Sequence, residues 1–194
     1  MILLIAGLAI FFAIHLLPTN RMLRAGLAGR FGEAAYKGIF SVIALAGFVM
    51  IVLGFAKMQA MLGSKNPILW DPPTWTRHVA FTLMLPAMIL LVAAFIPSRI
   101  RAAAKHPMLV AIKIWALAHL LANGDAASMI LFGSFLAYAV YDRISLKRRG
   151  DTGWGGADAP IINDVLVVVI GLALYAFMLF WGHGLLIGVP LVGA

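Results

Sequence analysis

Apolar residues fill most of the chain in six long runs, which are separated by short polar stretches. The runs cover approximately residues 1–17, 38–62, 78–97, 107–122, 126–141 and 161–187. A helix needs about 20 residues to cross about 30 Å of hydrocarbon, so the second, third and sixth runs are long enough and the first is marginal. We therefore predict an all-α, polytopic membrane helix bundle with about six transmembrane helices, in a single domain over 1–194.

The fourth and fifth runs are short, and the tight turn Asn123-Gly124-Asp125 joins them. Two interpretations fit this pair. The two helices can form a hairpin that crosses a locally thinned membrane, or the other helices can shelter them from lipid. We favour a true helical hairpin.

Composition agrees with a membrane location. Hydrophobic residues make up 63% of the 194 residues and charged residues only 11%, with a mean hydropathy of +1.01. A soluble domain of this length could not bury so much apolar surface. The chain contains no cysteine, which excludes disulfides, thiolate metal sites and thiol catalysis.

The net charge of +8 does not indicate a nucleic-acid partner, because the basic residues lie in short loops beside the apolar runs. Eleven of them lie in the first, third and fifth loops and three in the second. Basic residues are enriched in cytoplasmic loops, so we predict cytoplasmic odd-numbered loops, periplasmic termini and membrane lipid as the surroundings.

The five histidines are the candidate metal-binding residues of the chain. With this topology, His15 and His106 fall in one layer on the cytoplasmic side. His78, His119 and His183 fall in a second layer toward the periplasm, about 20 Å away by helix rise. Neutral imidazoles from two helices can bracket a haem iron, so each layer is a candidate site.

Less specific interpretations remain open for the same residues. A histidine at a helix end is often only an interfacial polar residue, which fits His78, and the glycines beside His183 suit close helix packing. Lys113, two turns after His106, can neutralise an acidic cofactor group such as a propionate or can extend toward the membrane surface. No local metal-binding signature accompanies the histidines.

Four segments resemble one family. HPMLVAIKIWALAHLLANGD and the following LFGSFLAYAVYDRISLKRR closely resemble the NnrU family of bacterial membrane proteins, and WDPPTWTRH and Ile14-His15 also fit. The resemblance spans essentially the whole chain. It implies a multi-pass protein of the bacterial inner membrane, linked to denitrification through reduction of nitrite and nitric oxide, without an established chemical role.

The family is in turn similar to 15-cis-zeta-carotene isomerase, a membrane enzyme that uses haem b. That similarity implies haem b as cofactor and His15 and His106 as its metal ligands. Lys113 and His119 are further cofactor-binding candidates by their positions in the sequence, and the similarity does not imply them. Lys105 stands where the isomerase has an arginine, and isomerase-type chemistry does not follow from the fold alone.

Two alternatives carry other functions. The chain can be a non-enzymatic accessory factor for nitrite or nitric oxide reductase components, with histidines that serve only helix packing. It also shares a histidine-proline element, His106-Pro107, with membrane methyltransferases that use S-adenosylmethionine. The tyrosine of that element is absent here and no glutamate follows Glu33, so this second alternative is the weaker one.

Overall fold

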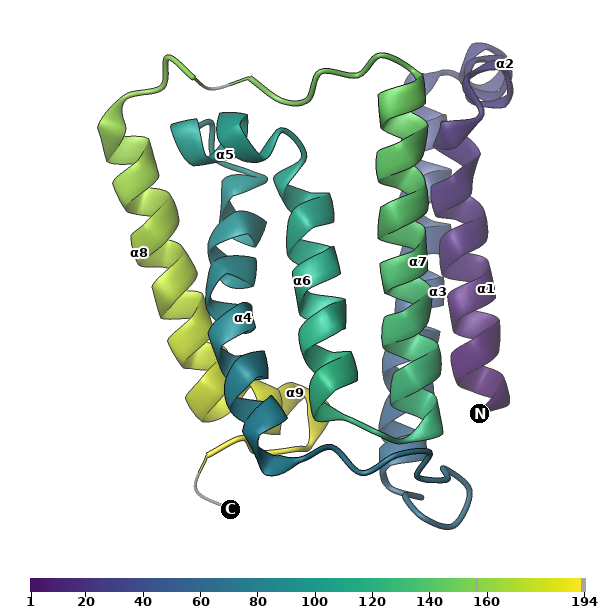
Figure 1. The fold of residues 1–194 in the computed structure, drawn as a ribbon. Coiled ribbons are helices and arrows are strands. Elements are labelled where there is room, and N and C mark those ends of the chain that lie inside the picture. The colour runs from purple at the N-terminus through teal and green to yellow at the C-terminus, as the bar shows by residue number, and fades with distance from the viewer. Residues whose placement is uncertain (156, 193–194) are drawn as a thin grey trace. The chain divides into compact units, whose positions relative to one another are not determined.

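The computed structural model describes residues 1–155 and 157–192, and these residues form helices joined by turns and loops. Figure 1 shows the helices in chain order. Their bounds are α1 Ile2–Leu16, α2 Arg21–Phe31, α3 Glu33–Gln59, α4 Thr74–Ala93, α5 Arg99–Ala104, α6 Pro107–Ala122, α7 Ala126–Arg148, α8 Ile161–Phe177 and α9 His183–Ile187, with a π-helical turn Met178–Gly182 between the last two. The all-α prediction is confirmed.

Five of the helical segments are long and apolar enough to cross a membrane. They are Ile2–Thr19, Glu33–Gln59, Thr74–Ala93, Ala126–Arg148 and Ile161–Ile187. The remaining predicted segment, the fourth run, is α6, an apolar helix of 16 residues. Large apolar side chains such as Val42 and Val169 are exposed on these helices, as expected where lipid replaces water.

The predicted bounds were too narrow at two helices. The fifth run was expected to end at 141, but α7 continues to Arg148 and reaches 23 residues. Its last turn carries Lys147 and Arg148, which are good helix formers with charges that are favourable near a helix C-terminus but which fall outside an apolar run. Similarly, α3 begins at Glu33 rather than at 38.

The chain packs as two compact units. The first consists of Met1–Leu69 and Asp125–Ser134, and the second of Trp70–Gly124 and the chain from Phe135 onward. Helix α7 contributes residues to both.

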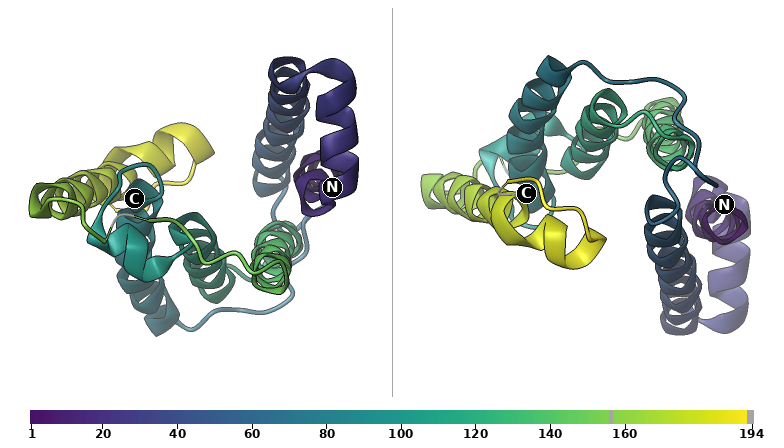
Figure 2. Two further views of the ribbon diagram at one scale, coloured as in Figure 1. Left: turned by 90° about the horizontal axis from the view of Figure 1, so that it is seen from above. Right: turned by 90° about the horizontal axis from the view of Figure 1, so that it is seen from below.

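In the first unit, α1 packs along α3, and Figure 2 shows the two side by side. Leu4 is fully buried in this contact and Ile51 nearly so. Glycines bring the two backbones together: a Cβ atom at Gly7 would lie 2.7 Å from the Ile51 nitrogen, and one at Gly54 would lie 2.5 Å from the Leu4 nitrogen. Small residues allow such close helix packing in a membrane.

We expect Gly54→Leu to separate α1 from α3 and to lower the free energy of unfolding by about 1–3 kcal/mol, the usual cost of overpacking. The measurement is the midpoint of thermal unfolding in detergent. Gly38→Leu is the matched control, because Gly38 lies on the same helix with nothing within 4 Å of its Cβ position. Equal midpoints for the two variants would contradict this account of the contact.

A polar network closes one end of the first unit. Asp125 Oδ1 accepts hydrogen bonds from Asn66 Nδ2 at 2.7 Å, Gln59 Nε2 at 3.2 Å and the Ser128 backbone nitrogen at 3.0 Å. Its Oδ2 accepts one from Ser128 Oγ at 2.6 Å. Asn66, fully buried, accepts one from the Ala127 nitrogen at 2.9 Å. The network caps α7 and ties the preceding loop to it.

In the second unit, α4 packs against both α6 and α8, and Figure 1 shows α4 between them. The short helix α5 is capped at its start by the Ser98 hydroxyl, which accepts a hydrogen bond from the Arg101 nitrogen at 3.1 Å. Asp164 in the first turn of α8 accepts one from the Ile100 nitrogen at 3.0 Å. The second bond ties α5 to the first turn of α8.

Candidate functional site

His106 is the residue that precedes α6, and its two neighbours in the chain determine its backbone conformation. Pro107 occupies the first turn of the helix, where its missing N–H costs nothing. Lys105, on the other side, has a φ of 61°, which is uncommon for a residue other than glycine and often marks a functional position. The His106 side chain is only 6% exposed.

The loop after α7 covers the turn formed by Lys105 and His106. The Trp154 nitrogen donates a hydrogen bond to the Lys105 carbonyl oxygen at 2.8 Å, and the Arg101 guanidinium lies 4.3 Å from the centre of the Trp154 ring. Gly153, with a φ of 94°, lies so close to Lys105 that a Cβ atom would be 2.5 Å from the Lys105 Cβ. The loop therefore fixes the unusual backbone of Lys105 and shields His106 from water.

The Nε2 atom of His106 is buried and has no hydrogen-bond partner in the part of the chain that the structure describes. The nearest charged oxygen is Asp151 Oδ1 at 3.6 Å, which is too far for a hydrogen bond. A buried polar atom without a partner is costly and calls for an explanation.

Charge and burial favour the neutral form of this imidazole. Burial lowers the pKa of His106 below its ordinary value of 6.5, and the positive charge of Arg143 lowers it further. The carboxylate of Asp151 raises the pKa but does not outweigh these effects. A neutral imidazole retains the nitrogen lone pair that a metal ion requires.

His15 lies in the last turn of α1, in the first unit. Its Nδ1 donates a hydrogen bond to the Phe11 carbonyl oxygen at 2.7 Å, and its ring stacks on that of Phe11 with centroids 4.0 Å apart. The Phe40 ring lies 5.2 Å away. Because Nδ1 carries the proton, the lone pair is on Nε2, the arrangement common in metal-ligating histidines.

His15 and His106 belong to different units, so their pairing stays a prediction. The same holds for Lys113, which is half-buried on α6, as a propionate contact. Two residues that contact the Lys105-His106 turn were not predicted. These are Asp151 and Trp154, and the only sequence signal for them was a tryptophan between glycines in an otherwise polar loop.

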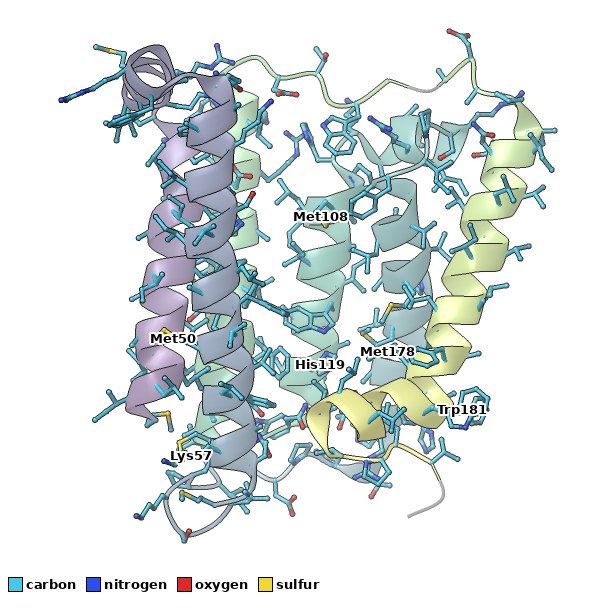
Figure 3. All side chains as sticks on the ribbon, turned by 180° about the vertical axis from the view of Figure 1, so that it is seen from behind. Met50, Lys57, Met108, His119, Met178 and Trp181 are labelled. Atoms are coloured by element: carbon cyan, nitrogen blue, oxygen red, sulfur yellow. The ribbon has the colours of Figure 1, made fainter. Side chains whose placement is uncertain are left out.

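The structure brings two histidines of the predicted outer layer together. The rings of His119 and His183 have centroids 6.4 Å apart and planes inclined by 18°. In Figure 3, Met108 and His119 mark the two ends of α6. His78, the third member, is exposed at the start of α4, which agrees with an interfacial residue.

Comparison with known proteins bears on the whole chain. A family model described as NnrU protein matches residues 3–191, a region that contains all five histidines. No curated protein and no solved structure matches the chain.

Proposed function

The chain belongs to the NnrU family, and from this premise we propose that it is a haem b protein of the bacterial inner membrane whose iron is held by His106 and His15. The observation that carries the proposal is the His106 side chain, which is buried and has an Nε2 atom without a hydrogen-bond partner among the described residues. An iron ion at this nitrogen would supply the missing partner.

The donor chemistry of the chain fits haem b. Haem iron in proteins is held by histidine, cysteine, methionine or tyrosine, and the absence of cysteine removes thiolate ligation. His15 presents the tautomer that suits iron, because its Nδ1–H is donated to Phe11. When bound, haem supplies an iron that exchanges single electrons.

The surrounding residues have separate tasks in this proposal. The loop that contains Trp154 excludes water from His106, and Lys113 offers a positive charge for a haem propionate. The role of such a haem in reduction of nitrite or nitric oxide rests on the family resemblance. If the chain is instead an accessory factor without haem, the purified protein should be colourless.

The test is the visible spectrum of the full-length protein, purified in detergent from cells grown with ample haem. We expect a Soret band and a pyridine haemochrome spectrum of the b type, with about one haem per chain, as one axial pair implies. A colourless preparation that elutes as a single helical species would overturn the proposal and support the accessory role.

A further inference from the structure

Helix α2, Arg21–Phe31, is amphipathic and has no buried residue in the part of the chain that the structure describes. It connects two apolar segments that are long enough to cross a membrane, Ile2–Thr19 and Glu33–Gln59. A connection between two such segments lies at the level of the lipid headgroups. We propose that α2 is an interfacial helix that binds the headgroups of anionic phospholipids.

The sequence makes α2 a helix of its own rather than an extension of a neighbour. The Asn20 side chain caps its start by accepting a hydrogen bond from the Leu23 nitrogen at 3.1 Å. Gly32 ends it with a φ of 83°, a conformation that glycine adopts without a steric cost. The 11 residues between them can therefore take a direction different from that of α1.

The direction of α2 suits a position in the headgroup layer. Figure 1 shows α2 end-on and α1 from the side, whereas the view from above in Figure 2 shows α2 from the side and α1 along its axis. Helix α2 therefore runs across the end of α1. A helix that lies in the membrane plane can bury its apolar side chains among the acyl chains and keep its charged ones among the headgroups.

Apolar side chains of α2 are exposed. Met22 is 87% exposed, Leu23 49% and Phe31 52%. Leu23, Leu27 and Phe31 follow one another at intervals of four residues, so they lie along one face of the helix. Acyl chains at the membrane surface would cover this face, as they do in other amphipathic helices of this type.

Two arginines of α2 provide the complementary charge for an anionic headgroup. Arg24 is already engaged, because its Nη2 lies 2.5 Å from Glu33 Oε1 and its guanidinium lies 5.5 Å from the centre of the Tyr36 ring. Arg21 and Arg30 are exposed, and no carboxylate pairs with them among the described residues. A guanidinium group binds phosphate through parallel hydrogen bonds. Arg21 and Arg30 are therefore the groups that we assign to lipid phosphates.

The test uses a fluorescent probe on α2 of the full-length protein. The chain contains no cysteine, so Gly29→Cys gives a single labelling site, and nothing lies within 4 Å of the Cβ position there. The labelled protein, in an uncharged detergent, is titrated with phosphatidylglycerol or with phosphatidylcholine of the same chain length. We expect the emission of an environment-sensitive dye to respond at an about tenfold lower concentration of phosphatidylglycerol.

Paired variants assign this preference to α2. Arg21→Gln with Arg30→Gln should abolish the preference for phosphatidylglycerol. Lys147→Gln with Arg148→Gln is the matched control, because it removes two exposed charges at the end of α7 and should leave the preference unchanged. If the first pair does not fold, about 0.5 M salt should reduce the preference of the labelled chain that retains both arginines, because salt screens exposed charges.

Four results would overturn the proposal. They are an equal response to both lipids, a preference that persists without Arg21 and Arg30, an equal loss of preference in the control pair, and a preference that salt does not reduce. Self-association of the protein in detergent that depends on Arg21 and Arg30 would instead make α2 a contact between two copies of the chain. Because the dye reports on α2 alone, none of these results depends on whether the protein holds haem.

Discussion

His106→Ala is expected to abolish the haem band of the purified protein. The substitution removes the nitrogen that we assign to the iron, and loss even of an outer contact at a metal site typically costs about 10- to 100-fold in affinity. The buried turn around Lys105 stays in place, because the Trp154 hydrogen bond reaches the Lys105 backbone and not the His106 ring. The measurement is the ratio of Soret to protein absorbance.

Matched variants separate ligation from folding. His78→Ala should keep the full band, since His78 is exposed on α4. Asp151→Ala should also keep the band. The Asp151 carboxylate lies 3.6 Å from His106 Nε2 and would compete with iron for this nitrogen. Added imidazole should restore the band of His106→Ala by entering the space of the deleted ring.

The partner of His106 is tested by His15→Ala, which should shift and weaken the band by removal of one of two axial ligands. Retention of the unaltered spectrum in His106→Ala would contradict the assignment. Loss of the band in His119→Ala alone would place the haem at the other end of α6.

The helices could be predicted because each depends on a property that is local in sequence. A long apolar run can satisfy its backbone in lipid only as a helix, and most of each of the six predicted runs is helical. The end of α7 could not be predicted from hydropathy, since its last residues are charged and are helical through propensity and end charges. The helix α5 was also missed, because six residues give no periodic pattern.

Only part of the candidate site could be predicted from the sequence. His106-Pro107 marked a helix start, and helix rise placed His119 and His183 in one layer, where the structure brings their rings together. The contacts of Asp151 and Trp154 come from a loop more than 40 residues later, and no local signal reports such a pairing. The left-handed backbone of Lys105 is likewise a product of tertiary packing, since lysine has no preference for it.

The contacts of Asp125 could not be predicted either, because they too come from residues far away in the sequence. The sequence predicted a tight turn at Asn123-Gly124-Asp125, and α6 and α7 are indeed joined by these residues. It did not reveal that Asp125 gathers hydrogen bonds from Gln59 and Asn66, about 60 residues earlier. Because Asp125 is buried and accepts these hydrogen bonds, its loss should have a large effect on folding.

Asp125→Ala is expected to lower the free energy of unfolding by about 3 kcal/mol, because it removes the cap of α7 and leaves buried amide and hydroxyl groups without an acceptor. Ser64→Ala is the control, since that hydroxyl donates only to the Met61 carbonyl oxygen in an exposed turn. The measurement is the midpoint of thermal unfolding in detergent. A midpoint equal to that of Ser64→Ala would contradict the role of the network.

Acid should weaken the same network in the unaltered chain. Burial raises the pKa of Asp125, but hydrogen bonds from Ser128, Asn66 and Gln59 outweigh it and hold the pKa below the ordinary value of 3.8. A carboxyl group whose pKa is lower in the folded state stabilises that state fully above its unfolded pKa, and the stabilisation disappears as the pH falls through the folded pKa. The thermal midpoint should therefore be insensitive to this group above about pH 5 and fall below about pH 4. Asp125→Asn keeps the shape without the titration, so its midpoint should fall less over the acidic range. Parallel curves for the two proteins would show that other carboxylates cause the acid sensitivity.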